Sequence, residues 1–443
     1  MTSRIPGPPA APADPPPAMP DAPTAVARGL AVAPATPSPV PAAAPAAVGT
    51  GAAVAASGAP ASAGLGAGPV FGEEDAETLR ERLWSAVQAR GEHAAVAVCF
   101  EALDGGMTAE DVLLDVIGPV QARVGQEWAA GRISVAQEHA ATAIHDRVIA
   151  AVAHRTPHAP SRTPRNSSGT APTRVTVACV EGEWHALPAR ILAEVLRGRG
   201  FTVDFLGAQV PTPHLIAHLH QTGPDVVALS SSIPTRLPAA HAAITAVQAI
   251  GLPVLAGGAA FGPQGRYARL LGADGWAPDA RAAAEILAAR LERPAPALPA
   301  GVPDAAGRLP HLEDQEYTLV VRSRPQLVKN VLTALEDRLP EMRSYTDQQR
   351  DRTTEDIAHI VDFLAASLYT DDPDLFAGFV TWTAGILQAR HVPATVLTPA
   401  LDLLAAELGD FPRALTHLGA AHAALTAFPS RTTAPVPGPG NHA

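Results

Sequence analysis

The sequence predicts a multidomain protein that combines all-α and α/β domains: a four-helix bundle, a domain around a five-stranded parallel sheet, and a further all-helical domain. Apolar residues recur at helical spacing in residues 71–155 and 311–428, whereas residues 173–293 alternate short β-rich runs with helical stretches. Polar or Pro-rich linkers separate these blocks at 156–172 and 294–310. With 443 residues, 47% of them hydrophobic, the chain has enough apolar material for two or three cores.

The two ends of the chain, residues 1–70 and 429–443, are predicted to be disordered. The leading segment consists almost entirely of Ala, Pro, Gly, Ser and Val, and it carries very few charges. It has no aromatic residues, and its prolines interrupt every helical stretch. Such a segment cannot bury enough apolar surface to offset the entropy lost on folding, so we expect it to act as a tether.

The first folded block, residues 71–155, is expected to be the four-helix bundle. Its apolar residues return every three or four positions, and glycines mark the turns between helices. The residues that carry this pattern include Leu79, Leu83, Val87, Val112 and Val116, with turns at Gly105, Gly106 and Gly131.

The second block, residues 173–293, predicts a flavodoxin-like (Rossmann-like) sheet with crossover helices. Its ligand should lie where the carboxyl ends of the strands meet, so the loops after the first, third and fourth strands are the expected functional positions. The expected strands are Val175–Val180, Phe201–Leu206, Val226–Ser230, Pro253–Ala256 and Gly275–Ala277, with helices at Ala189–Arg197 and Ala239–Ile250.

The third block, residues 311–428, has a helical pattern throughout, and no internal repeat relates it to the bundle. Its expected helices include Gln326–Arg338, Thr354–Leu368, Leu375–Arg390 and Thr398–Leu408.

Composition favours a soluble, cytoplasmic protein. A formal charge of −11 without a local Lys/Arg block argues against nucleic-acid binding, and no apolar run is long enough for a bilayer. Neither a signal peptide nor a phosphate loop is evident. The two cysteines, Cys99 and Cys179, are predicted in a helix and a buried strand, far apart, which excludes a disulfide framework or a zinc site.

The loop after the first strand contains a histidine with a carboxylate two residues before it, at His185 and Glu183. Imidazole is a good ligand for cobalt and related metals. A carboxylate that accepts the second ring N–H orients the imidazole and raises the basicity of the metal-bound nitrogen. Taken alone, such a histidine is more often a solvent-exposed loop residue.

Small residues follow the third and fourth strands, at Ser230 to Ser232 and at Gly257 and Gly258, where they would let a bulky ligand approach the backbone. Together with the histidine loop, this arrangement resembles the cobalamin-binding domains of corrinoid proteins. The resemblance implies that His185 is the lower cobalt ligand, that Glu183 and Ser230 support it, and that the two glycines line the channel for the nucleotide tail. Glu183 replaces the commoner Asp, and Pro188 replaces the motif glycine.

In the bundle, Trp128 is followed after nine residues by Glu138 and His139. This spacing resembles the signature of cobalamin photoreceptors of the CarH and LitR type. The resemblance implies that Trp128 covers the upper face of adenosylcobalamin, that Glu138 hydrogen-bonds the adenosyl group, and that His139 takes its place on cobalt after light. The amino-terminal DNA-binding module of those photoreceptors is missing from the segment before the bundle, so we expect no direct DNA repression.

The third block resembles globin-like or phycobiliprotein-like sensor domains, and the domain order resembles the photocobilins, which bind biliverdin as a second pigment. The resemblance implies a bilin site, for which the candidate residues are Arg350, Arg352, His359, Trp382 and His391. The propionates of a bilin would need cationic partners, for which Arg350, Arg352 and His391 are the candidates. A helical docking or dimerisation domain without a pigment is the competing interpretation.

These features predict a light sensor and not an enzyme, because no catalytic constellation is evident. Its expected partner is a second copy of the chain or a downstream signalling protein. Two alternatives remain: a corrinoid carrier for a methyltransferase, which has no use for Trp128, Glu138 and His139 as a set, and an interaction module with an empty cofactor site.

Overall fold

The computed structural model describes residues 73–156, 173–289, 291 and 314–429. The predicted leader (1–70), the linker residues 157–172 and 294–310, and the tail beyond Pro429 lie outside these ranges. Within them, no helix has both the length and the apolar character needed to cross a bilayer.

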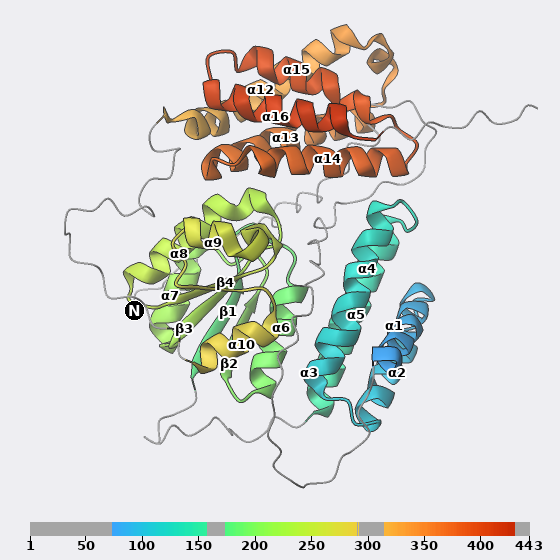
Figure 1. Cartoon of the computed structure of the whole chain (residues 1–443), viewed down its shortest axis with the longest axis vertical. Coiled ribbons are helices and arrows are strands. Elements are labelled where there is room, and N and C mark those ends of the chain that lie inside the picture. Colours follow the sequence, from blue (N-terminus) through green and yellow to red (C-terminus); the bar gives the residue numbers. More distant parts are fainter. Residues whose placement is uncertain (1–72, 157–172, 290, 292–313, 430–443) are drawn as a thin grey trace, which may run out of the picture.

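The first block is a helical domain whose segments form four rods (Figure 1). A capping box at Ser134 begins the last of them, because its hydroxyl accepts the N–H of Gln137 while the Gln137 side chain accepts the N–H of Ser134. The third rod joins α3, a π-helical turn at Val112–Ile117 and α4 without a break. The helices are α1 (Glu73–Gln88), α2 (Glu92–Asp104), α3 (Ala109–Asp111), α4 (Gly118–Ala129) and α5 (Val135–Arg155).

The second block contains the predicted five-stranded parallel sheet, which the structure confirms. The strand order is β2-β1-β3-β4-β5, so the order reverses between β1 and β3. The pairing of Cys179 with Ser230, and of Ser230 with Gly257, aligns the carboxyl ends of the three central strands. The strands are β1 (Arg174–Cys179), β2 (Thr202–Gly207), β3 (Val226–Ser230), β4 (Val254–Gly257) and β5 (Gly275–Ala277).

Helices cover both faces of this sheet (Figure 1). One apolar core joins the sheet to α7 (Thr212–Thr222), α8 (Leu237–Ala249) and α9 (Arg266–Leu270). A second core joins the other face to α6 (Leu187–Gly198) and α10 (Ala280–Ala288). The outer side of α6 packs on the bundle through Leu187, Ile191 and Val195, which belong to the bundle core.

The third block is also helical, and its first helix is longer than predicted. That helix begins at Glu316 instead of Gln326 and continues through Pro325. Proline removes only one helical hydrogen bond, to the carbonyl of the half-exposed Val321, and the buried Val320 and Leu327 hold the helix on both sides. The helices are α12 (Glu316–Arg338), α13 (Asp347–Thr370), α14 (Pro373–Ala389), α15 (Thr398–Glu407) and α16 (Pro412–Ala427).

The third block contacts both other blocks. Trp382 and Ile386 of α14 join the core of the bundle. On the α/β domain, the Tyr267 hydroxyl donates to Asp372, and His241 hydrogen-bonds Tyr369 at 2.6 Å. The three blocks therefore surround a common space at the carboxyl edge of the sheet (Figure 1).

Candidate functional site

A cavity of about 1460 Å³ occupies this common space. Ligand pockets of ordinary size measure about 300–1,000 Å³, so this one has room for a large cofactor or for two ligands. Most of the residues predicted from the sequence line it: Trp128, Glu138, His139, His185, Ser230, Ser232, Gly257, Gly258, His359 and Trp382. Pro188, Arg236 and Tyr267 line it as well, and the last two were not predicted.

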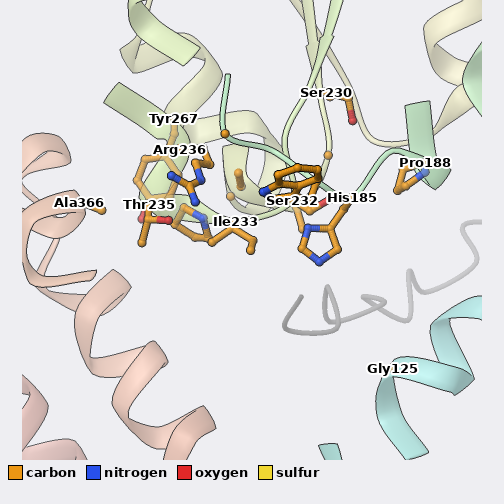
Figure 2. Close-up of a pocket in the computed structure, with 18 of the residues that line it drawn as sticks. Gly125, His185, Pro188, Ser230, Ser232, Ile233, Thr235, Arg236, Tyr267 and Ala366 are labelled. Carbon is orange, nitrogen blue, oxygen red and sulfur yellow. The ribbon is translucent and has the colours of Figure 1, made fainter. Parts of the chain in front are cut away.

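His185 stands at the edge of the α/β domain, in the loop between β1 and α6. Figure 2 shows its ring extending toward α4, where Gly125 lies. Nδ1 of His185 lies 2.6 Å from Oε1 of Glu183, and the same oxygen accepts the backbone N–H of His185 at 2.9 Å. Because a carboxylate can only accept, Nδ1 carries the proton and Nε2 keeps its lone pair for a metal.

Glu183 is buried beneath this loop, and its second oxygen is also held. Oε2 accepts the backbone N–H groups of Ser232 at 2.6 Å and Ile233 at 3.1 Å, and the hydroxyl of Ser231 at 3.2 Å. Burial raises the pKa of Glu183, but hydrogen bonds and charge attraction from His185 and Ser232 outweigh it and lower the pKa to about 2. The carboxylate is therefore ionised, and it orients His185 before any ligand arrives.

The hydroxyl that contacts Glu183 belongs to Ser231, whereas the sequence had suggested Ser230, which lines the cavity one residue earlier. Gly258 explains how the two loops meet. It has a φ of +100°, and a Cβ built there would lie 2.3 Å from the carbonyl oxygen of Ser231. Only glycine allows this approach, so Gly258 lets its loop pack against the loop that holds Glu183.

The bundle forms the facing wall. Glu138 and His139 lie in the first turns of α5, with His139 Nδ1 2.7 Å from Glu138 Oε2. The His139 side chain is 60% exposed, while Glu138 is mostly covered. Oε1 of Glu138 accepts the hydroxyl of Thr142 at 3.0 Å. Nε2 of His139 is thus left with a free lone pair beside the cavity.

Trp128 is fully buried at the end of α4, where the third block covers it. Its ring lies 6.3 Å from that of Trp382, and the guanidinium of Arg390 lies 5.3 Å from its centroid. Arg390 also donates to the carbonyl oxygens of Trp128 and Ala129 at 3.1 and 3.2 Å. Trp128 is therefore held between the cavity and α14.

The third wall, from α13 and α14, combines aromatic rings with a buried acid. Phe363 and Phe379 stack at 3.8 Å between centroids. Among the described residues, neither carboxylate oxygen of Asp356 has a hydrogen-bond partner. Burial raises the pKa of Asp356 well above its ordinary value and lowers that of His359 to about 4. Burial thus disfavours the charged form of both side chains.

Three of the five bilin candidates lie outside the cavity lining: Arg350, Arg352 and His391. Arg350 pairs with Glu336 and donates to the carbonyl of Met342, and neither partner lines the cavity. Asp356 is a residue of this wall that the sequence did not predict. Its place one turn before His359 could have suggested a shared face, but its missing partners could not be read from the sequence.

Within the described residues, no three His, Cys, Asp or Glu side chains cluster to hold a metal ion. A metal at His185 would therefore have to bring its remaining ligands with it.

Comparisons with known proteins match two segments of the chain to family models, both described as a B12 binding domain. One covers residues 79–153 and the other residues 173–285. The third block is not covered, and its globin-like character remains a prediction.

Two curated proteins of Myxococcus xanthus are similar over 42% of this chain: the HTH-type transcriptional repressors CarA, at 32% identity, and CarH, at 30%. The chain spans about 60% of the length of each. A solved Methanosarcina barkeri monomethylamine corrinoid protein shares 17% identity, with a TM-score of 0.41 over 48% of this chain and 98% of its own. A cobalamin-binding protein of Desulfitobacterium hafniense shares 20%, with a TM-score of 0.26 over 47% and 96%. The chain thus carries two adjoining B12-binding domains and is distantly similar to the CarA and CarH repressors.

Proposed function

We propose that this protein is a light sensor that binds adenosylcobalamin between the bundle and the α/β domain, and that it is not an enzyme. The observation that carries the proposal is the placement of His185, with its Nε2 lone pair available, in the same cavity as Trp128, Glu138 and His139. Bound adenosylcobalamin would supply a cobalt–carbon bond that light can break.

The residues present fit this cofactor. His185 offers one neutral imidazole nitrogen to a metal that already carries its equatorial ligands, and Glu183 fixes its tautomer. Gly257 and Gly258 leave the backbone open beside the cavity. On the facing wall, the Glu138 carboxylate can accept hydrogen bonds from a hydroxyl-bearing upper ligand, and His139 holds a second imidazole at that wall.

We propose biliverdin as a second chromophore, held by the third block. Two features support it: the stacked pair of Phe363 and Phe379 beside Trp382, which suits a flat conjugated molecule, and Asp356, whose oxygens can accept N–H groups. Arg350, Arg352 and His391 are not part of this proposal because they lie outside the lining.

We propose that the signal passes to a protein, either a second copy or a downstream partner. The net charge of −11 supports protein contacts over direct binding of nucleic acid.

The experiment is a dark titration of the purified protein with adenosylcobalamin, followed by absorption spectra before and after green light. A light sensor should bind the cofactor with His185 on cobalt and change its spectrum irreversibly on illumination. Binding of methylcobalamin with no preference for adenosylcobalamin would instead support a corrinoid carrier. No binding of either would support an interaction module.

A parallel titration with biliverdin tests the second chromophore. The intact protein should develop a structured red band that disappears on denaturation, since both cysteines are buried outside the cavity lining. Asp356→Leu should weaken that band, while Asp351→Leu, on the exposed side of the same helix, should not. Equal weak binding by all three proteins would remove biliverdin from the proposal.

A further inference from the structure

A chain of hydrogen bonds leads from the cavity into the core of the bundle. Thr142 donates its hydroxyl to Oε1 of Glu138 at 3.0 Å, and Nε2 of Gln121 donates to the hydroxyl oxygen of Thr142 at 2.9 Å. Oε1 of Gln121 lies 2.5 Å from Nδ1 of His145. The chain therefore joins α4 to α5 and ends at His145, which is completely buried.

Each bond in this chain has one permitted direction. A carboxylate accepts, so Thr142 must give its single proton to Glu138. Thr142 can then only accept from Gln121, which turns the amide NH₂ toward Thr142 and the amide oxygen toward His145. Since an amide oxygen cannot donate, Nδ1 of His145 must carry the proton.

Burial alone does not account for a histidine at position 145. Its Nε2 has no hydrogen-bond partner among the described residues, and burial lowers its pKa to about 4, so the ring is neutral. A buried acceptor without a partner destabilises the fold, and an apolar residue would avoid this cost. The group that His145 contributes is the Nδ1–H donor, which keeps the amide of Gln121 in one orientation.

We propose that Gln121 and His145 are positioning residues that hold the Thr142 hydroxyl on Oε1 of Glu138, and so keep the Glu138 side chain where it can accept hydroxyl groups of an upper cobalt ligand such as adenosyl, in preference to methyl. Because Thr142 holds Oε1, the Glu138 side chain stays at the cavity wall, and its other lone pairs remain available to a ligand. A methyl group has no donor to satisfy them. This inference rests on the proposed binding of adenosylcobalamin.

The test compares the dark affinities of the full chain for adenosylcobalamin and methylcobalamin. In Gln121→Leu, the preference for adenosylcobalamin should fall about tenfold, the value of one hydrogen bond to a charged group, while methylcobalamin affinity stays near that of wild type. His145→Leu should act in the same direction. His145→Asn should restore much of the preference, because its amide places an N–H near the position of Nδ1.

Val148→Ala is the matched control, since Val148 is a fully buried residue of the same helix without a polar side chain. It should lower the unfolding temperature without changing the preference. Equal losses of both affinities in Gln121→Leu and His145→Leu would overturn the proposal and indicate packing alone. A wild-type protein that binds both cobalamins equally would overturn it too, yet leave cobalamin binding intact.

A measurement on the protein without cofactor distinguishes the proposed function from the proposed role of Gln121 and His145. In the apo protein at neutral pH, nitrogen NMR of His145 should show a neutral ring protonated at Nδ1. Protonation at Nε2 would mean that Nδ1 accepts a hydrogen bond from Gln121, so the Gln121 amide would have to turn its oxygen toward Thr142. That result would contradict the proposal even if adenosylcobalamin binds. If neither cobalamin binds to wild type, the proposed function and the selectivity proposal both fail.

Discussion

The cavity has two buried carboxylates that differ in almost every respect. Glu183, in the α/β domain, has both oxygens occupied by the protein, and its pKa is lowered to about 2. Asp356, in the third block, has neither oxygen hydrogen-bonded within the described residues, and burial raises its pKa well above the ordinary value. Glu183 already holds His185 in place through its hydrogen bonds. Asp356 has both oxygens available for hydrogen bonds with a ligand.

The difference shows that one wall of the cavity is preorganised and another is not. A carboxylate already paired with backbone N–H groups stabilises the fold and the ligand site together. A buried acid without a partner destabilises the fold until a donor arrives. Substitutions at the two positions should therefore have opposite effects on the protein without cofactors.

The largest effect is expected at His185, which depends on the preorganised wall. His185→Ala should remove the spectrum of a histidine-bound cobalt and weaken adenosylcobalamin binding by more than about 100-fold, since loss of a mere supporting partner costs about 10–100-fold. Dark titration with absorption spectroscopy measures both. His214→Ala, on the exposed side of α7, is the control and should bind normally. An unchanged dark spectrum in His185→Ala would exclude His185 as the lower ligand.

A smaller loss, about 10–100-fold in affinity, is expected for Glu183→Gln. An amide has one acceptor oxygen instead of two, and its NH₂ would face the N–H groups of Ser232 and Ile233 or the ring of His185. The same titration measures the loss, and Glu181→Gln in the same loop serves as the control. Wild-type affinity in Glu183→Gln would mean that His185 orients itself without this carboxylate.

The opposite sign is expected for Asp356→Leu. A folded-state pKa above the unfolded one means that the folded protein loses stability as pH rises through the window between the two values. Above that window, Leu should stabilise the cofactor-free protein by about 1–3 kcal/mol, or a few degrees in unfolding temperature. The pH-dependent part of this gain should vanish below the unfolded pKa of about 4. Thermal unfolding at several pH values measures it.

Asp362→Leu, on the same helix, is the control for that measurement. Asp362 pairs with Arg324 at 2.5 and 2.8 Å, so its removal should not stabilise the protein. Should Asp356→Leu destabilise the protein at neutral pH, Asp356 would have to possess a partner of its own, and the contrast with Glu183 would disappear.

The smallest effect in the dark is expected for His139→Ala, because this side chain is mostly exposed. Dark affinity and unfolding temperature should stay close to those of wild type. After green light, however, the variant should differ in spectrum and should exchange its upper ligand with added imidazole, which wild type should resist. Identical illuminated spectra would rule out His139 as the replacing ligand.

Local pattern was sufficient to predict several parts of the molecule. The positions of the strands and their parallel arrangement followed from the alternation of β-rich and helical stretches, and each expected strand agrees with the structure to within one residue at either end. Glu183 and His185 are two residues apart in one loop, so their pairing needed no long-range information. The predicted helix began too late, at Gln326 and not at Glu316, because proline usually ends or begins a helix. Packing on both sides of Pro325 holds this helix together, and the local sequence does not show that packing.

Only the tertiary structure decided which distant residues share the cavity. It selected Ser231 as the hydroxyl on Glu183, brought Asp356 to the cavity wall, and left Arg350 and His391 outside it. The bond between Gln121 and His145 likewise joins residues on two helices that are 24 positions apart in the sequence. Sequence periodicity determines which face of an element is buried, but the partner of a buried polar group depends on how whole elements pack against one another.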